Sequence, residues 1–391
     1  MGSTDYYMPS ADSPDLVIVI PTDAERIECL DLNGQEWKGP LNSAQYIQRE
    51  NHLINQDITR DGALTCWVLV DGTLPPDDRP ILSSCESFSK AAFLAHGGHV
   101  EDILAHGVGS VFCRPEFRGR GYARRMIAEL AEKLDTWQHE KTARGKSVFS
   151  VLYSDIGKKF YAQFGWKAFP SSHFSLAPIS KEEFGSDIAG LEGVAVRDMT
   201  GEDVKQFMCS KAVINKYREI LREASKCSKT SKVALSPDFE HMSWHWAREE
   251  FYSQALLPER GVPNIKGACV EDCRVFVTWN RNFGNKKNEN TLYILRCLYD
   301  EPTSPSEEKP IVKALAGVLF RAQLEAHEWD MDHVEIWNPT PLIEKAVKLL
   351  SPDTEMVHRE KSSICSLKWN GASLGLGDEV DWFWNEKYAW C

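Results

Sequence analysis

Apolar residues recur every three or four positions after residue 121, and this spacing predicts an amphipathic helix. A run of strand length lies just before it, at Val108–Phe112, so the sequence predicts a strand, a turn and a helix in succession. The residues on the apolar stripe of the helix are Ala123, Met126, Ile127, Leu130, Ala131 and Leu134.

The same patterns predict the order of the other elements in the first half. Helical periodicity is found in Asp23–Gln56 and Asp155–Phe164, and Gly165 is a typical cap at the end of the second segment. We therefore expect an α/β (α+β) fold with a mixed central sheet flanked by helices. Runs rich in apolar, β-branched and aromatic residues predict strands at Leu16–Ile20, Thr65–Val70, Ile81–Leu94, Ser147–Tyr153 and Trp166–Phe169.

The second half carries a fainter repeat of this order. Strand-like runs at Ala268–Trp279 and Thr291–Leu298 precede a helical segment at Lys313–Ala326. The run Val334–Trp337 then leads into a helix, as Phe149–Tyr161 does in the first half. We predict two related domains, residues 1–192 and 193–391, because a chain of 391 residues is too long for one compact core.

Composition narrows the range of partners. The chain has 45 Lys and Arg against 57 Asp and Glu, a formal net charge of −12, which argues against nucleic acid and anionic membranes and favours cationic acceptors. The 11 cysteines lack paired spacings and indicate free thiols in a reducing compartment. No apolar run approaches the roughly 18 residues of a membrane span, so we expect a cytoplasmic protein.

Two motifs that suggest a metal are incomplete. His241 and His245 are four residues apart on a predicted helix, but the glutamate of the metalloprotease motif does not follow the first histidine. Cys269 and Cys273 have no second pair at ligand spacing. We therefore expect no metal.

A glycine-containing turn between a strand and a helix is the strongest candidate site. It reads R-G-R-G-Y-A from Arg118 to Ala123, an R-x-x-G-x-A pattern. Gly119 and Gly121 allow the backbone to approach an anion closely, and the first N–H groups of the helix, at the positive end of its dipole, would hold a pyrophosphate. The spacing excludes both the Walker loop and the dinucleotide fingerprint.

This turn resembles motif A of the GCN5-related N-acetyltransferase (GNAT) superfamily, written [QR]-x-x-G-x-[GA]. The resemblance implies a GNAT fold with acetyl-coenzyme A as the co-substrate. It also implies that the strand ending near Val111 and Phe112 binds the pantetheine arm through its backbone. The residues that it assigns to the pyrophosphate are Arg118, Gly119, Arg120, Gly121, Tyr122 and Ala123.

A second segment resembles the same superfamily. The family pattern N-x-x-A-x-x-F-Y-x-x-x-G-F corresponds to S-D-I-G-K-K-F-Y-A-Q-F-G-W, from Ser154 to Trp166. The resemblance places Tyr161 at the general acid, whose phenol would protonate the leaving thiolate. Ser154 and Gly157 replace the family's commoner Asn and Ala in this segment.

The second domain is expected to be GNAT-like but to lack a coenzyme A site. Its corresponding segment, Tyr299–Val312, has prolines and four carboxylates but no glycine, and Lys345 stands where Tyr161 stands in the first half. Prolines remove N–H donors and carboxylates repel a diphosphate. The domain would then shape the acceptor pocket, and an unrelated α+β domain is the alternative.

Nearly the whole chain resembles the fungal lysine N6-acetyltransferases of lysine catabolism, through the Tyr161 segment and an acidic, Trp-rich C-terminus. This resemblance implies acetyl transfer to the ε-amine of free lysine. A polyamine, a xenobiotic amine or a protein amine are alternative acceptors, and a non-catalytic acyl-coenzyme A-binding scaffold is an alternative function.

Free lysine makes two demands on the pocket. Its carboxylate requires an Arg or Lys that the sequence does not single out. Its ammonium must lose a proton before attack, because only the neutral amine is a nucleophile. The candidate bases are Glu101, Asp102, His106 and the terminal carboxylate of Cys391.

Overall fold

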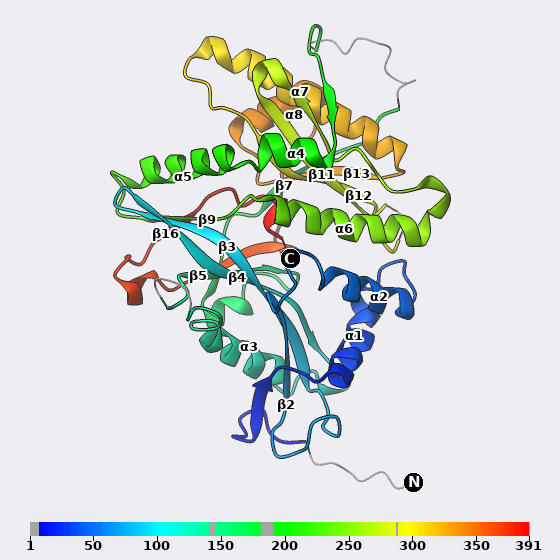
Figure 1. The fold of residues 1–391 in the computed structure, drawn as a ribbon, viewed down its shortest axis with the longest axis vertical. Helices are drawn as coiled ribbons and strands as arrows, with labels where there is room; N and C mark the ends of the chain where they lie inside the picture. Colours follow the sequence, from blue (N-terminus) through cyan, green and yellow to red (C-terminus); the bar gives the residue numbers. More distant parts are fainter. Residues whose placement is uncertain (1–7, 141–144, 181–190, 287, 391) are drawn as a thin grey trace.

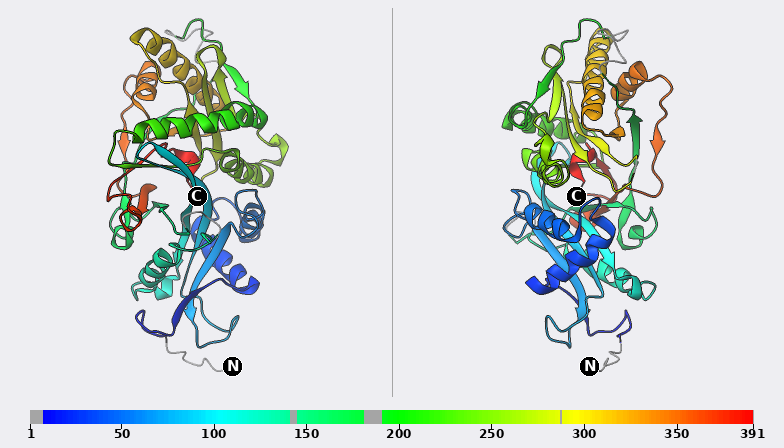
Figure 2. Two further views of the ribbon diagram at one scale, coloured as in Figure 1. Left: turned by 60° about the vertical axis from the view of Figure 1, so that its left-hand side comes forward. Right: turned by 90° about the vertical axis from the view of Figure 1, so that its right-hand side faces the viewer.

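The computed structural model describes residues 8–140, 145–180, 191–286 and 288–390 (Figure 1). In this part the strands form two mixed sheets, each flanked by helices. The two halves stack along the long axis, and helix α6 (Phe239–Leu256) and the red C-terminal segment lie between them (Figure 2). This arrangement is the α/β fold that the sequence predicts.

The first half begins with strand β1 and ends with β7. Its elements are β1 (Leu16–Val19), α1 (Asp23–Trp37), α2 (Ser43–Leu53), β2 (Leu64–Asp71), β3 (Ser83–His96), β4 (His99–Cys113), α3 (Tyr122–Lys133), β5 (Phe149–Ser154), β6 (Trp166–Ala168) and β7 (Ser172–Leu176).

The second half begins with strand β8 and contains the longest helix. Its elements are β8 (Arg197–Met199), α4 (Gly201–Met208), α5 (Lys211–Ser225), β9 (Ser231–Leu235), α6, β10 (Gly267–Val270), β11 (Val275–Asn282), β12 (Thr291–Leu298), α7 (Pro305–Glu328), β13 (His333–Trp337), α8 (Pro341–Leu350), β14 (Val357–His358), β15 (Ile364–Trp369) and β16 (Val380–Trp382). Short 3₁₀ helices lie at Pro115–Phe117, Tyr161–Phe164, Pro258–Arg260, Glu271–Cys273, Gly371–Leu374 and Lys387–Ala389.

The two sheets exchange strands. The first has the order β1-β2-β3-β4-β5-β15-β6, with β9 paired to β3 and β16 paired to β9. The second has the order β14-β7-β13-β12-β11-β10-β8. Strand β7 therefore contributes to the second sheet, while β9, β15 and β16 contribute to the first. The division into two domains near residue 192 stays a prediction. Strands on either side of this position form hydrogen bonds with strands on the other side.

Two predicted elements differ from the structure in kind, and the helix predicted at Lys313–Ala326 begins earlier, at Pro305. The helix expected at Asp155–Phe164 is only the 3₁₀ helix Tyr161–Phe164, because Gly157 has φ +80° and its N–H donates to the Lys361 carbonyl. A helical turn cannot continue through this left-handed residue. The strand expected at Ala268–Trp279 is a hairpin of β10 and β11, broken at Glu271–Cys273.

Helix α3 forms as its apolar spacing predicts, and its stripe packs on the first sheet. Met126, Ile127 and Leu130 are fully buried in one cluster with Leu69 of β2 and Leu152 of β5. Burial of such side chains contributes roughly 1.5–3 kcal/mol each, which holds the helix and its N-terminal turn in place.

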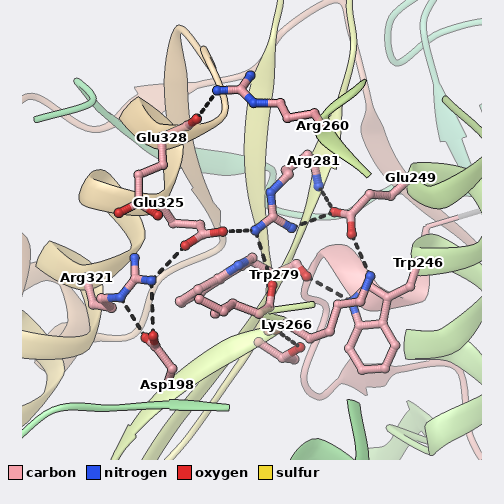
Figure 3. Close-up of polar contacts among 12 residues, drawn as sticks. Asp198, Trp246, Glu249, Arg260, Lys266, Trp279, Arg281, Arg321, Glu325 and Glu328 are labelled. Carbon is pink, nitrogen blue, oxygen red and sulfur yellow. Dashed lines mark hydrogen bonds and ion pairs between the residues drawn. The ribbon is translucent and has the colours of Figure 1, made fainter. Parts of the chain in front are cut away.

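A chain of buried ion pairs anchors α6 to the second sheet (Figure 3). Glu249 accepts from Lys266 at 2.8 Å and from the Arg281 guanidinium at 3.0 Å, and Arg281 also pairs with Glu325 of α7. Arg321 extends the chain from Glu325, at 2.8 Å. Charges this deeply buried are tolerated only when they are paired. The network therefore fixes the position of α6 and, with it, of Arg248.

Candidate active site

Strands β4 and β5 separate in the middle of the first sheet. Their parallel pairing covers His106 to Val108 on β4 and ends at the pair Val108 and Leu152, although β4 continues to Cys113. A register shift between Ser84 and Glu86 of β3 lies opposite this point, and Ser110 has φ +51°. A bulge of this kind bends a strand away from its neighbour. The backbone of β4 beyond Val108, including Val111 and Phe112, therefore loses β5 as a hydrogen-bond partner.

The glycine turn lies where β4 leads into α3. Gly119 has φ +80° and Gly121, the N-cap of α3, has φ +90°. Both glycines and Arg120 are exposed, and the N-cap has no side-chain hydrogen bond. Arg118 pairs with Glu36 at 3.0 Å and lies over the Phe112 ring. The first amides of α3 are thus unobstructed by a cap, as a diphosphate cradle requires.

The next two residues of the turn fix the helix start. Tyr122 is buried, and its hydroxyl donates to the Pro9 carbonyl at 2.6 Å. Ala123 is half-buried and begins the apolar stripe. These two residues support the turn through packing, while the exposed residues before them face outward.

A cavity of about 210 Å³ opens at the point where β4 and β5 separate. It is lined by Gly109 and Ser110 of β4, by α2, by α6 and by Trp390 near the C-terminus. Ligand pockets for drug-sized molecules occupy roughly 300–1,000 Å³, so this cavity suits a small metabolite. Its lining includes three acids, Glu50, Glu86 and Asp155, and three arginines, Arg26, Arg49 and Arg248.

Glu86 is a buried carboxyl in the lining of this cavity. It lies on β3 opposite Gly109, is 9% exposed, and accepts a hydrogen bond from Ser110 Oγ at 2.6 Å. Burial, followed by the nearby Glu50 charge, raises the pKa of Glu86 to about 7. It makes no ion pair within the described part of the chain. A carboxylate in this state is suited to accept a proton near neutral pH.

Comparisons with known proteins identify the family of the chain. Residues 173–391 match the family described as the LYC1 GNAT-like C-terminal domain, and this match covers more than half of the chain. The chain belongs to this family. It is a GNAT-type N-acetyltransferase.

Two relatives of this acetyltransferase are fungal. The uncharacterized protein YGR111W of Saccharomyces cerevisiae is 24% identical over 97% of this chain and 99% of its own length. A protein named lysine acetyltransferase, from Yarrowia lipolytica, is 24% identical over 67% of this chain and 70% of its own.

Solved structures share the fold. A GCN5-related N-acetyltransferase from Kribbella flavida is 17% identical with a TM-score of 0.50, and the match covers 92% of this chain and 72% of that one. The N-myristoyltransferase of Saccharomyces cerevisiae with bound myristoyl-CoA is 10% identical with a TM-score of 0.52, covering 93% and 80%.

Tyr161 lies beside the last paired residues of β4 and β5. It starts the 3₁₀ helix Tyr161–Phe164, is 8% exposed, and packs in the cluster that contains Val108 and Leu152. Burial raises the pKa of its phenol well above the usual value. Tyr161 therefore stays protonated at neutral pH, which is the state that a proton donor requires. It does not line the cavity that contains Glu86.

The three described base candidates, Glu101, Asp102 and His106, do not line this cavity either. Asp102 pairs with Arg218, and Glu101, its neighbour on β4, pairs in register with Leu94. His106 is fully buried, its Nε2 lies 3.1 Å from Gln138 Oε1, and burial lowers its pKa to about 4. Cys391 lies outside the described residues.

Sequence reasoning missed Glu86. The only signal was a single carboxylate inside an otherwise small and apolar strand, in S-S-C-E-S-F. It also missed Arg248, because this residue lies in a helix whose sequence contains no recognisable motif.

The acetyltransferase has a larger cavity in its second half. It measures about 760 Å³ and lies between the ends of β12 and β13, two parallel strands. Asp300 and Glu301 are among its lining residues, and the first turn of α7 carries Glu307 and Glu308.

No helix in the described ranges is long and apolar enough to cross a bilayer, and those ranges contain no group of three residues suited to a metal.

Proposed function

We propose that the protein transfers the acetyl group of acetyl-coenzyme A to the ε-amine of free lysine. One observation carries this proposal: the carboxyl of Glu86, with a pKa of about 7, faces a small cavity at the separation of β4 and β5. A general base at this location can take a proton from an acceptor amine next to the acyl donor.

The residues of the first half supply the donor site. The backbone N–H groups from Gly119 to Ala123 would hold the diphosphate, and the unpaired edge of β4 at Val111 and Phe112 would bind the pantetheine amides. Acetyl-coenzyme A supplies the activated acyl group. We propose one donor site per chain, because the start of α7 differs from the start of α3. Gly119 and Gly121 precede α3, whereas Asp300 and Glu301 precede α7 and its first turn contains Glu307 and Glu308.

The chemistry needs three proton transfers. An ammonium group loses its first proton to the Glu86 carboxylate, and the neutral amine attacks the thioester carbonyl. The C–N bond forms, the attacking nitrogen releases its second proton to solvent, the C–S bond breaks, and the Tyr161 hydroxyl protonates the thiolate. Proton return from Glu86 to Tyr161 through solvent restores both groups. General acid and base steps of this kind contribute roughly 10²- to 10⁴-fold each.

Lysine as the acceptor rests on the small, partly acidic cavity and on the name of the Yarrowia lipolytica relative. A polyamine lacks the carboxylate that the arginines on the wall would bind, and a protein amine is larger than the cavity. The printed name of this relative supports lysine as the acceptor, and a cytoplasmic role in lysine catabolism stays a prediction.

A screen of acceptors tests the proposal. Release of coenzyme A thiol is measured with free lysine, spermidine and a peptide amine under identical conditions. We expect kcat/KM to be highest for lysine, with acetyl on the ε-nitrogen by mass spectrometry. Preference for spermidine or the peptide would reassign the acceptor. Binding of acetyl-coenzyme A without turnover of any amine would favour the scaffold function.

A further inference from the structure

The wall of the Glu86 cavity formed by α6 contains an arginine without an acidic partner. Arg248 lines the cavity, and its Nη1 donates to Asn282 Oδ1 at 2.8 Å. Its guanidinium makes no ion pair with any residue that the structure describes, whereas the neighbouring Arg49 pairs with Glu50. A guanidinium has five N–H donors, so most of the donors of Arg248 remain available to a ligand.

Aromatic rings hold this guanidinium in place. Its Cζ lies 5.5 Å from the centre of the Tyr252 ring and 5.7 Å from that of Trp390. Arg49 approaches the same Tyr252 ring at 5.3 Å, so two like charges share one ring. Rings contribute to binding a cation but do not neutralise it. The positive charge of Arg248 is therefore fixed at the cavity wall, and the Glu50 carboxylate that acts on it is itself paired with Arg49.

A second cation without an acidic partner lies behind the same wall. Lys387 is 6% exposed, and its Nζ lies 4.0 Å from the ring centre of Trp390, 4.2 Å from Trp337 and 4.3 Å from Tyr293. In the described ranges its Nζ makes no hydrogen bond or ion pair. Burial and the charge of Arg248 lower the pKa of Lys387 to about 7, while the Glu335 and Asp155 carboxylates act in the opposite direction. Two adjacent basic groups without a direct acidic partner favour an anion beside them.

The cavity is also lined by a carboxylate from a different element, Glu86. Glu86 comes from β3 and Arg248 from α6, and the apolar residues Leu53, Leu64 and Phe88 also line the cavity. A ligand that fits has an amine at one end, a short methylene chain and a carboxylate at the other end. This pattern favours an ω-amino acid over a simple diamine as the ligand.

We propose that Arg248 binds the α-carboxylate of an amino-acid acceptor and that Lys387 supports it as a positioning residue behind Trp390. This inference rests on the proposed function, because it assigns the other end of the same acceptor. It makes the enzyme selective for ω-amino acids over diamines of the same length, since guanidinium and carboxylate form two parallel hydrogen bonds.

Paired acceptors test the inference. Lysine is compared with cadaverine, which has the same chain and amine but no carboxylate. In the native enzyme we expect a higher kcat/KM for lysine. In Arg248→Met we expect the ratio of lysine to cadaverine to fall roughly 30- to 1,000-fold, the usual cost of removing one partner of a buried charge pair. Arg248→Lys keeps the charge without the fork and should fall between the two.

A matched control and a binding measurement complete the test. Arg260→Met removes an arginine that pairs with Asp330 and lies over Trp329, away from the cavity, and should leave the ratio unchanged. Lys387→Met should lower the ratio less than Arg248→Met. Calorimetry with Nε-acetyl-lysine and N-acetylcadaverine measures the same preference without turnover.

The outcomes separate the two proposals. Equal kcat/KM for lysine and cadaverine in the native enzyme overturns the carboxylate site and leaves acetyl transfer standing. An equal loss for both acceptors in folded Arg248→Met, checked by thermal denaturation, would assign Arg248 to a carboxylate of the chain itself and overturn the inference. Absence of acetyl transfer to any amine refutes the proposed function, and the calorimetric preference then decides the carboxylate site alone.

Discussion

At the scale of single residues, Glu86 combines a buried position with a like-charged neighbour. Burial and Glu50 raise its pKa, while the Ser110 hydroxyl, Cys66 and Arg26 act in the opposite direction. The net result is a carboxyl that ionises near pH 7 rather than near 4.5. Such a group is protonated and inactive as a base below pH 7 and ionised above it.

We predict that kcat/KM for lysine rises through an inflection near pH 7 as Glu86 loses its proton. Glu86→Gln should lower kcat roughly 10²- to 10⁴-fold and remove this inflection, because an amide cannot accept the proton. Glu240→Gln, at an exposed position of α6, serves as the control. A persistent inflection near pH 7 in Glu86→Gln would assign the base to another group.

Tyr161 acts, in the proposed chemistry, on the leaving group rather than on the acceptor. Tyr161→Phe should lower kcat roughly 10²- to 10⁴-fold while the affinity for acetyl-coenzyme A barely changes, because only the proton donor is lost. Stopped-flow thiol release and calorimetry measure the two quantities. Tyr299→Phe, which removes a hydroxyl bonded to Thr340, is the control. Turnover near that of the native enzyme would reduce Tyr161 to a packing residue.

Single residues also mark the limit of prediction from this sequence. Tyr161 was reached because a recurrent local pattern surrounds it. Glu86 and Arg248 were not, because their roles arise from a shared cavity between β3 and α6, elements more than 140 residues apart in sequence. No local pattern encodes that proximity.

At the scale of elements, the strand-to-helix turn before α3 contains glycine at two left-handed positions, Gly119 and Gly121. Gly121 has φ +90°, and a β-carbon there would lie 3.1 Å from that of Ala11. Gly121→Asp adds strain and a negative charge at the proposed diphosphate site. We predict at least a 100-fold loss of acetyl-coenzyme A affinity by calorimetry, with the fold retained.

The same substitution at a second glycine, Gly97, distinguishes the effect of backbone strain from the effect of a negative charge at the ligand. Gly97→Asp places the same residue at φ +57° in the β3–β4 turn, where a β-carbon meets no atom within 4 Å. It should retain normal affinity. Equal loss in both variants would attribute the effect to backbone strain alone and remove the turn from the donor site.

Elements with strong local signals were predicted correctly, and those shaped by distant contacts were not. Helix α3 follows its apolar spacing. The segment 155–164 has helical spacing. However, Ser154 Oγ accepts a hydrogen bond from the Ile156 amide, and the Gly157 N–H donates to the carbonyl of Lys361. Tertiary contacts there outweigh the local preference, which is worth only tenths of a kcal/mol per residue.

At the scale of the whole molecule, the exchange of strands joins the two halves into one unit. Leu176 of β7 pairs with Val334 of β13, and Leu367 of β15 pairs with Val151 of β5. The sequence repeat predicted the order of elements within each half but not this exchange. Period-two patterns identify a strand and its buried face, whereas they carry no information on which distant strand is its neighbour.

The C-terminal segment places the last described residues between the halves. The Trp390 ring lines the cavity and contacts the cation of Lys387, and the Ala389 carbonyl accepts from Lys90 Nζ at 3.2 Å. An aromatic terminal segment with these contacts is packed rather than frayed. Its removal would open the acceptor cavity without reaching the glycine turn before α3.

We therefore predict that deletion of residues 389–391 leaves a folded protein with normal acetyl-coenzyme A affinity and turnover reduced at least 100-fold. Trp390→Ala separates two causes. If the loss comes from the cavity wall, the substitution reproduces most of it and KM for lysine rises. If the terminal carboxylate accepts the proton, the substitution keeps most activity, and the deletion is partly rescued at high pH, where more free amine is present. Full activity after the deletion would exclude the segment from the mechanism, and unfolding would restrict it to packing.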